Sequence, residues 1–131
     1  MSDIKLAKEL EQKYKIDLRE RFIVFSTNVF RYIATLPHRI EYEVFRIQIS
    51  KSATSMGANY EEAQNSSLKE FAQRVKIALR EGRETEYWFK VLHRMNIGDQ
   101  DQLANLSKEI NELCLILGKI LFKVNKKISS S

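Results

Sequence analysis

The sequence predicts an all-α protein folded as an antiparallel, up-down-up-down four-helix bundle. Apolar residues recur at steps of three and four along most of the 131-residue chain, which is the spacing of one face of an α-helix. Glycine (4) and proline (1) are scarce, so few turns can form and long helices are favoured over many short strands. The breaks between the periodic segments are short, and short connections make consecutive helices antiparallel neighbours.

The first bundle helix is expected over residues 17–36. Asp17 stands at the N-cap position, with Glu20 at the capping-box position three residues later. Pro37 ends the helix, because the residue before a proline disfavours the α conformation. The stripe expected to face the core consists of Leu18, Phe22, Phe25, Val29, Tyr32, Ile33 and Leu36. The preceding residues 1–16 are expected to form a short leading helix or a frayed extension.

The second helix, expected over residues 38–64, is apolar on two faces. Its main stripe consists of Tyr42, Phe45, Ile49, Ala53, Met56, Tyr60 and Ala63. A second, weaker stripe consists of Ile40, Val44, Ile47, Thr54 and Ala58. A helix with two apolar faces is usually covered on both, so we expect this helix to be the central one. Small side chains around Gly57 would let a neighbouring helix approach closely, although this glycine costs ~1 kcal/mol of helix propensity.

The third helix is expected over residues 67–95, with Ser67 as its N-cap and Glu70 at the capping-box position. Its core stripe consists of Phe71, Val75, Ala78, Gly82, Thr85, Phe89 and Leu92. Three consecutive aromatic residues, 87–89, cannot all face one core. At least one of them, with Trp88 the candidate for assembly, is expected at a rim or a subunit interface, and a solvent-exposed tyrosine is an equal alternative.

The fourth helix is expected over residues 100–127, starting at Asp99 or Asp101. Its core stripe consists of Leu103, Leu106, Ile110, Leu113, Leu117, Ile120 and Val124. Lysines are concentrated in its last turns, where positive charge is favoured by the helix dipole. Because there is no second composition zone and no linker, residues 1–131 are expected to form a single domain.

The composition bounds the class of protein. Hydrophobic (44%) and charged (30%) fractions are typical of a soluble helical domain. The single cysteine, Cys114, excludes an internal disulfide and a cysteine-cluster metal site, and favours a reducing compartment. The N-terminal sequence lacks the apolar segment of an export signal, and no apolar run approaches ~18 residues, so a cytoplasmic location is expected.

The sequence carries few signs of catalysis. It contains no glycine-rich phosphate loop, no HExxH and no paired CxxC. A di-iron bundle requires Glu-x-x-His on two helices, and that motif is absent. The two histidines, His38 and His93, stand at helix ends, where a surface role is far more common than a catalytic one. No metal or cofactor is therefore expected.

Five glutamates on the second and third helices form a possible acid/base site. They are Glu61, Glu62, Glu81, Glu84 and Glu86, and Asn59, Arg80 and Arg83 accompany them. An antiparallel pairing places the glutamates of one helix about three turns from those of the other, given a rise of ~1.5 Å per residue. This separation favours a polar seam or a salt-bridged subunit contact over shared catalysis within one protomer.

The net charge of +5 permits binding to nucleic acid without requiring it, since the charges could simply solvate the helix surfaces. Residues 65–98 carry seven basic and four acidic side chains, whereas residues 38–64 carry three and four. The candidate nucleic-acid-binding residues are Lys69, Arg74, Lys76, Arg80, Arg83, Lys90, Arg94, Lys123, Lys126 and Lys127. An oligomer would present these charges together.

Three segments are distinctive in combination: residues 53–63 (ATSMGANYEEA), 67–71 (SLKEF) and 77–88 (IALREGRETEYW). With the Leu36-Pro37 break, they resemble the four helix bundle protein family, which includes proteins encoded in intervening sequences of bacterial 23S ribosomal RNA genes. The resemblance covers about residues 17–125. Gly82 departs from it, because the family more often has alanine there.

The resemblance implies a homopentamer. It also implies kinship with the accessory proteins of diversity-generating retroelements, which partner a reverse transcriptase and nucleic acid. Matched positions expected to serve packing or assembly, taken with the small residues and the tryptophan noted above, are Ala53, Gly57, Asn59, Glu62, Glu81, Glu84 and Trp88.

Together, residues and resemblance predict a non-catalytic, self-assembling bundle of a bacterial cytoplasm that binds RNA or DNA. Two alternatives stay open. A protein-interaction scaffold would bind its partner without dependence on salt. An enzyme using carboxylates across a subunit interface would require strongly raised carboxylate pKa values in a cleft.

Overall fold

The structure is a computed structural model that describes Lys8, Glu9, Gln12 and residues 17–130. Most of the expected leading extension therefore lies outside the described residues. From residue 17 onward the elements are α2 (Leu18–Ile33), the 3-10 helix η1 (Ile40–Tyr42), α3 (Glu43–Ala63), α4 (Leu68–Met95) and α5 (Gln100–Ser129).

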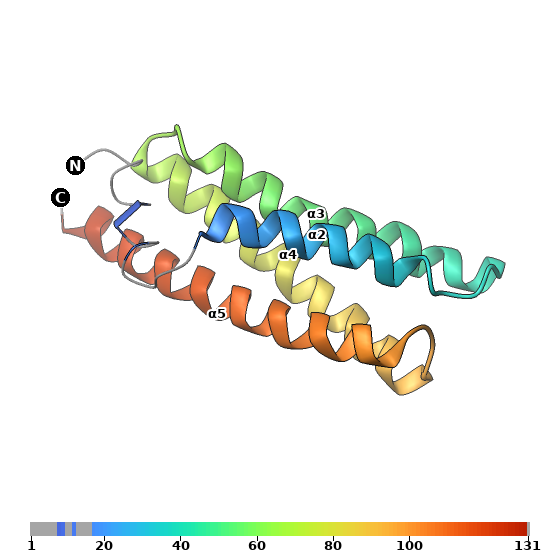
Figure 1. The fold of residues 1–131 in the computed structure, drawn as a ribbon. Helices are drawn as coiled ribbons and strands as arrows, with labels where there is room; N and C mark the ends of the chain where they lie inside the picture. The colour runs from blue at the N-terminus through green and yellow to red at the C-terminus, as the bar shows by residue number, and fades with distance from the viewer. Residues whose placement is uncertain (1–7, 10–11, 13–16, 131) are drawn as a thin grey trace.

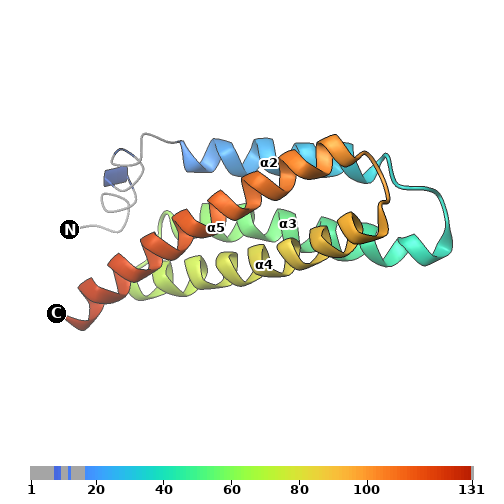
Figure 2. The same cartoon turned by 90° about the horizontal axis from the view of Figure 1, so that it is seen from below.

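The four α-helices run side by side along one long axis, with their connections at the two ends (Figure 1). Helix α3 packs against α2 and α4, and α5 closes the bundle by contacting α4 and, less extensively, α2. Seen from below, α5 begins beside α2 and crosses obliquely towards the side of α3 and α4 (Figure 2). The predicted all-α four-helix bundle is confirmed.

Each long helix for which an N-cap residue was expected has one of the expected residues at its N-cap. The Asp17 carboxylate accepts a hydrogen bond from the Glu20 backbone N–H (3.1 Å), and the Ser67 hydroxyl accepts one from Glu70 N–H (3.2 Å). For α5 the cap is Asp99, which accepts from Gln102 N–H at 2.9 Å. Asp99 and not Asp101 therefore starts the last helix.

The boundaries differ from prediction around the first connection. Helix α2 ends at Ile33 and not at 36, and the segment predicted as a helix from 38 begins with η1, so α3 starts only at Glu43. Arg46 holds this connection, because its guanidinium donates to the carbonyl oxygens of Leu36 (2.9 Å) and Pro37 (2.6 Å). Leu36 and Pro37 lie beyond the end of α2, so Arg46 pairs carbonyl groups of the connection itself.

The main apolar stripes predicted for the helices form one buried core, apart from Tyr42, which is half-buried. Within that core the hydroxyl groups of Thr85 on α4 and Ser52 on α3 lie 2.8 Å apart and form a hydrogen bond. This bond pairs the two fully buried serine and threonine hydroxyls of the described chain.

The second apolar face of α3 is not covered, contrary to expectation. Ile40 is 88% exposed, and Val44 and Ile47 are also exposed. The reason is geometric: among the described residues, the long helices that pack extensively against α3 are α2 and α4, and these residues lie on its outer side.

Two glycines allow close helix approach. A Cβ on Gly57 would lie 2.9 Å from the Cβ of Phe22, so α2 and α3 could not pack at their present distance. A Cβ on Gly82 would lie 2.6 Å from the Cys114 Sγ and 2.7 Å from the Met56 Cε, so α4 meets α5 and α3 at this point. Gly118, in contrast, has open space where a Cβ would stand.

Replacing Gly57 with leucine should lower the free energy of unfolding by about 1–3 kcal/mol, because the side chain overpacks the contact with Phe22. Gly118→Leu is the matched control: it adds the same side chain to a helix interior with free space, and it should not lower the melting temperature. Thermal unfolding of both variants checks this. An unchanged melting temperature for Gly57→Leu would contradict the close contact between α2 and α3.

Candidate nucleic-acid interface

Helix α4 carries a straight stripe of basic residues on its outer face. The stripe consists of Lys69, Gln73, Lys76, Arg80, Arg83, Tyr87, Lys90 and Arg94, which follow one another at alternating steps of four and three. All eight are exposed. Each lies two residues from a core position, a rotation of about 200°, so the stripe faces away from the core along about 38 Å of helix. It contains no acidic residue.

The C-terminal half of α5 continues this surface. Leu115, Lys119, Phe122 and Lys126 recur at steps of four, three and four, and all four are exposed. No acidic residue occurs between residues 113 and 131. We call the α4 stripe and these four α5 residues the cationic face.

A hollow of about 630 Å³ lies between α4 and α5 within the cationic face. It is lined by Arg83, Cys114, Leu115, Gly118, Lys119, Phe122 and Lys123. Burial raises the pKa of the Cys114 thiol to about 12, so this sulfur stays protonated and is a poor nucleophile at neutral pH. The hollow therefore offers surface and charge, and no activated nucleophile among its lining residues.

The structure separates the predicted basic residues into two groups. Six of the α4 residues and Lys126 belong to the cationic face, and Lys123 lines its hollow. Arg74 does not: it lies on the side of α4 that faces α3, where it pairs with Glu62 (2.5 Å) and approaches Asn59 (3.4 Å). Lys127 is half-buried and turned away from Lys126 by about 100°.

Sequence reasoning did not select Lys119, Phe122, Leu115 or Gly118 for this site. The sequence did contain a signal for this site. Phe122 is large and apolar, yet its position in the helical repeat lies outside the core stripe of its helix. Its side chain is 70% exposed.

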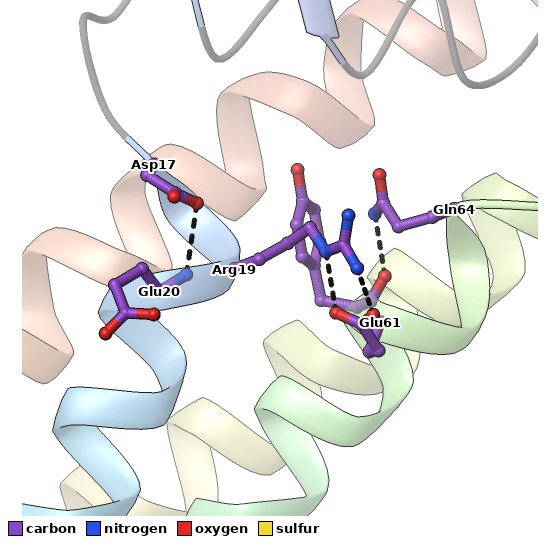
Figure 3. A network of polar contacts seen from close by, with 6 residues as sticks. Asp17, Arg19, Glu20, Glu61 and Gln64 are labelled. Carbon is purple, nitrogen blue, oxygen red and sulfur yellow. Dashed lines mark hydrogen bonds and ion pairs between the residues drawn. The ribbon is translucent and has the colours of Figure 1, made fainter.

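The five glutamates do not form one site. Glu61 pairs with Arg19, Glu62 with Arg74, and Glu86 with Arg83 at 2.8 Å. The hydrogen bond from Arg19 lowers the pKa of Glu61. Figure 3 shows this pair between α2 and α3, beside the Asp17 cap and the Gln64 amide, which donates to the Tyr60 carbonyl oxygen at 2.7 Å. Three of the carboxylates are thus held in separate ion pairs.

Glu81 and Glu84 lie together on α4, towards Lys51 of α3. Burial and the neighbouring Glu84 raise the pKa of Glu81, while Lys51 and Arg80 act in the opposite direction. Of the remaining positions predicted for packing, Ala53 is buried in the core. Trp88 is half-buried between Phe45 and Tyr87. Its indole N–H is enclosed and has no hydrogen-bond partner within the described chain. Phe89 is buried and Tyr87 is exposed, which is compatible both with a subunit interface and with a solvent-exposed tyrosine.

Among the residues that the structure describes, no cluster of histidine, cysteine, aspartate and glutamate has the arrangement of a metal site. His93 is exposed near the end of α4, whereas His38 is exposed in the connection between α2 and η1 and does not open a helix as expected. None of the described helices combines the length and apolarity needed to cross a membrane.

The geometry defines a four-helix bundle with a cationic face, and the described part holds no group of residues arranged as a metal site. The 23S rRNA-intervening sequence protein family matches residues 14–119. A solved structure from the S23 ribosomal protein family of Bacteroides thetaiotaomicron, a protein of unknown function, is 30% identical and superposes with a TM-score of 0.72. The match covers 79% of this chain and 97% of that one. No curated protein matches.

The chain therefore belongs to the 23S rRNA-intervening sequence protein family. Residues 120–131, which include Phe122 and three of the lysines of α5, lie beyond the matched region.

Replacing Glu81 with glutamine should stabilise the protein at neutral pH. A carboxyl whose pKa is raised by folding binds more protons in the folded state, so stability falls as pH rises from the ordinary carboxyl range through the raised pKa. Glu81→Gln removes this loss, and its advantage over wild type should disappear at about pH 3, well below the ordinary carboxyl pKa, where the carboxyl is protonated in both states. Urea unfolding at both pH values measures it.

A contrasting variant is Glu109→Gln, which loses the salt bridge to Arg21 (2.6 Å) between α5 and α2 and should be less stable than wild type at pH 7. A pH-independent effect of Glu81→Gln would show that its carboxyl is not perturbed by folding.

Proposed function

We propose that this protein binds nucleic acid through the cationic face, without catalysing a reaction, and that it does so as a self-assembled oligomer. The observation that carries the proposal is the alignment of six basic side chains on one exposed stripe of α4, next to the lysines of α5. Phosphate binding depends on the number of positive charges presented together.

The arrangement of charge supports a polyanion over a folded protein partner. Within the described residues, Lys69, Lys76, Arg80, Lys90 and Arg94 of the stripe make no salt bridge, whereas basic residues on the other sides of the helices, such as Arg21 and Arg74, are paired with glutamates. The row of cations spans about 38 Å. This length suits the repeated phosphates of a nucleic-acid backbone, whereas an isolated acidic side chain would contact only a small part of the row.

The family name gives a reason to test RNA first, because the intervening sequences that it refers to interrupt 23S ribosomal RNA genes. We infer a structured RNA as the first candidate ligand and DNA as the second. A reverse transcriptase or another protein bound to the same nucleic acid would be a further partner.

Self-assembly is proposed through the opposite side of the bundle. Ile23 (60% exposed) and Phe30 on α2 flank a hollow of about 640 Å³ between α2 and α3, which Phe22, Gly57 and Ala58 also line. Ile47 extends the exposed apolar surface on α3. Exposed apolar surface of this kind is typical of protein–protein contacts, and the family resemblance implies five copies.

The proposed nucleic-acid binding predicts how the affinity for RNA depends on salt. The double variant Lys76→Gln/Arg80→Gln should weaken binding and reduce the slope of log affinity against log salt by about 1.4–1.8 for each protomer in contact, since each lost phosphate contact contributes ~0.7–0.9. Fluorescence anisotropy with a labelled structured RNA over a salt series measures the slope.

Arg74→Gln is the matched control, because Arg74 lies off the stripe and is paired with Glu62. It should leave the slope nearly unchanged. An equal effect of Arg74→Gln would mean that only overall charge matters, and absence of wild-type binding at low salt would overturn the nucleic-acid proposal in favour of a protein-interaction scaffold.

The proposed assembly predicts that a charged residue on the α2–α3 side will separate the copies. Ile23→Asp should convert the oligomer to monomer, because it buries a carboxylate in an apolar contact that already has Glu20 and Glu61 nearby. Val24→Asp, one residue on and turned by about 100° towards α5, should leave the mass unchanged. Sedimentation velocity measures both. A monomeric wild type, or equal dissociation of both variants, would exclude this interface.

A further inference from the structure

The hollow between α4 and α5 combines an exposed aromatic ring with several cationic side chains. Phe122 is the most exposed aromatic residue among the large apolar side chains that face solvent in the described chain, at 70%. Lys119, Lys123 and Arg83 line the same hollow. An exposed phenylalanine that only served the core would be turned inwards, as Phe25 and Phe89 are.

We propose that this hollow binds an unpaired nucleotide, whose base stacks on Phe122 while the flanking phosphates contact the surrounding cations. The inference rests on the proposed function and specifies its ligand: a single-stranded or loop segment, not a continuous duplex. Bases in a duplex stack on each other, so only an unpaired base has a face available for a protein ring.

The shape of the hollow fits this ligand. Its volume of about 630 Å³ falls within the range of small-ligand sites, ~300–1,000 Å³. Gly118 forms part of its wall, and no atom lies within 4 Å of the place where a Cβ would stand. The space above Gly118 is therefore open to a planar group that packs against the ring of Phe122, four residues further along α5.

The electrostatics distinguish this hollow from the one between α2 and α3. That second hollow also has an exposed phenylalanine, Phe30, but its charged lining consists of Asp17, Glu20 and Glu61 with a single arginine, Arg19, which pairs with Glu61. A phosphate would be repelled there. The lining of the α4–α5 hollow contains two lysines and Arg83, which pairs with Glu86 beside the lining residue Cys114, and no lining residue carries a carboxylate.

The test compares affinity for an unstructured oligouridine with affinity for an RNA duplex of equal length. Phe122→Leu keeps an apolar side chain but removes the ring. It should weaken oligouridine binding about 5- to 150-fold, the range expected for loss of one stacked base, and change duplex binding less than twofold. Phe122→Trp, which retains an aromatic face, should bind oligouridine as wild type does.

Two further variants complete the design. Gly118→Leu fills the hollow without a clash and should weaken oligouridine binding while the melting temperature does not fall. Phe30→Leu makes the same change in the α2–α3 hollow and should leave binding unaffected.

The outcomes separate the two proposals. If wild type binds neither RNA, the proposed function fails and this inference fails with it. If wild type binds RNA but Phe122→Leu binds oligouridine equally well, loses duplex affinity to the same extent, or changes the oligomeric mass, only the base-stacking inference is overturned. The last of these results would identify the hollow as a contact between copies of the chain.

Discussion

The meeting of α3, α4 and α5 at Gly82 is the contact on which the orientation of α4 in the bundle depends. Met56 of α3 and Cys114 of α5 both approach this position so closely that a Cβ would overlap with them, at 2.7 and 2.6 Å. Three helices therefore meet at the middle of α4, and its rotation about its own axis is fixed there. The outer stripe of α4 is set by the same rotation, because Arg80 and Arg83 flank Gly82 in the sequence and their side chains point away from it. The packing of the core thus determines which charges face solvent.

The sequence was sufficient to predict the four helices and the residues that bury them, because a long period of three and four leaves little ambiguity about the inner face. It was not sufficient for the second apolar face of α3. Ile40, Val44 and Ile47 have helical spacing, but spacing does not reveal how many neighbours a helix has, and here a third neighbour is missing. Arg74 was grouped with the other basic residues by composition. Its position in the helical repeat places Arg74 on the side of α4 that faces α3, where it pairs with Glu62, and so separates it from the basic stripe. The hollow around Phe122 depends on how α5 crosses α4, which no periodicity within a single helix encodes.

The two apolar hollows differ in the charges around them, and this difference suits them to the two separate roles proposed above. On the α2–α3 side, Arg19 pairs with Glu61, and Asp17 and Glu20 lie near the start of α2, so the surroundings are acidic overall. On the α4–α5 side the lining is basic. Apolar contact between copies and electrostatic contact with a polyanion would then occupy opposite sides of each bundle, because α2 and α3 form one pair of neighbours and α4 and α5 the other. Assembly through one side leaves the other open to a ligand.

The same division explains why a chain with a net charge of only +5 could bind RNA with useful affinity. Affinity for a polyanion depends on how many cations contact phosphates at once and not on the net charge of the chain. Four of the seven glutamates of α3 and α4, namely Glu43, Glu61, Glu62 and Glu86, are held in ion pairs with arginines. Of these only the pair between Glu86 and Arg83 involves the stripe, and Arg83 stays more than half exposed in it. Each copy added by assembly would contribute another stripe without bringing new carboxylates to it. The number of phosphates neutralised would therefore rise with the number of copies in contact, and the dependence on salt would become steeper in proportion.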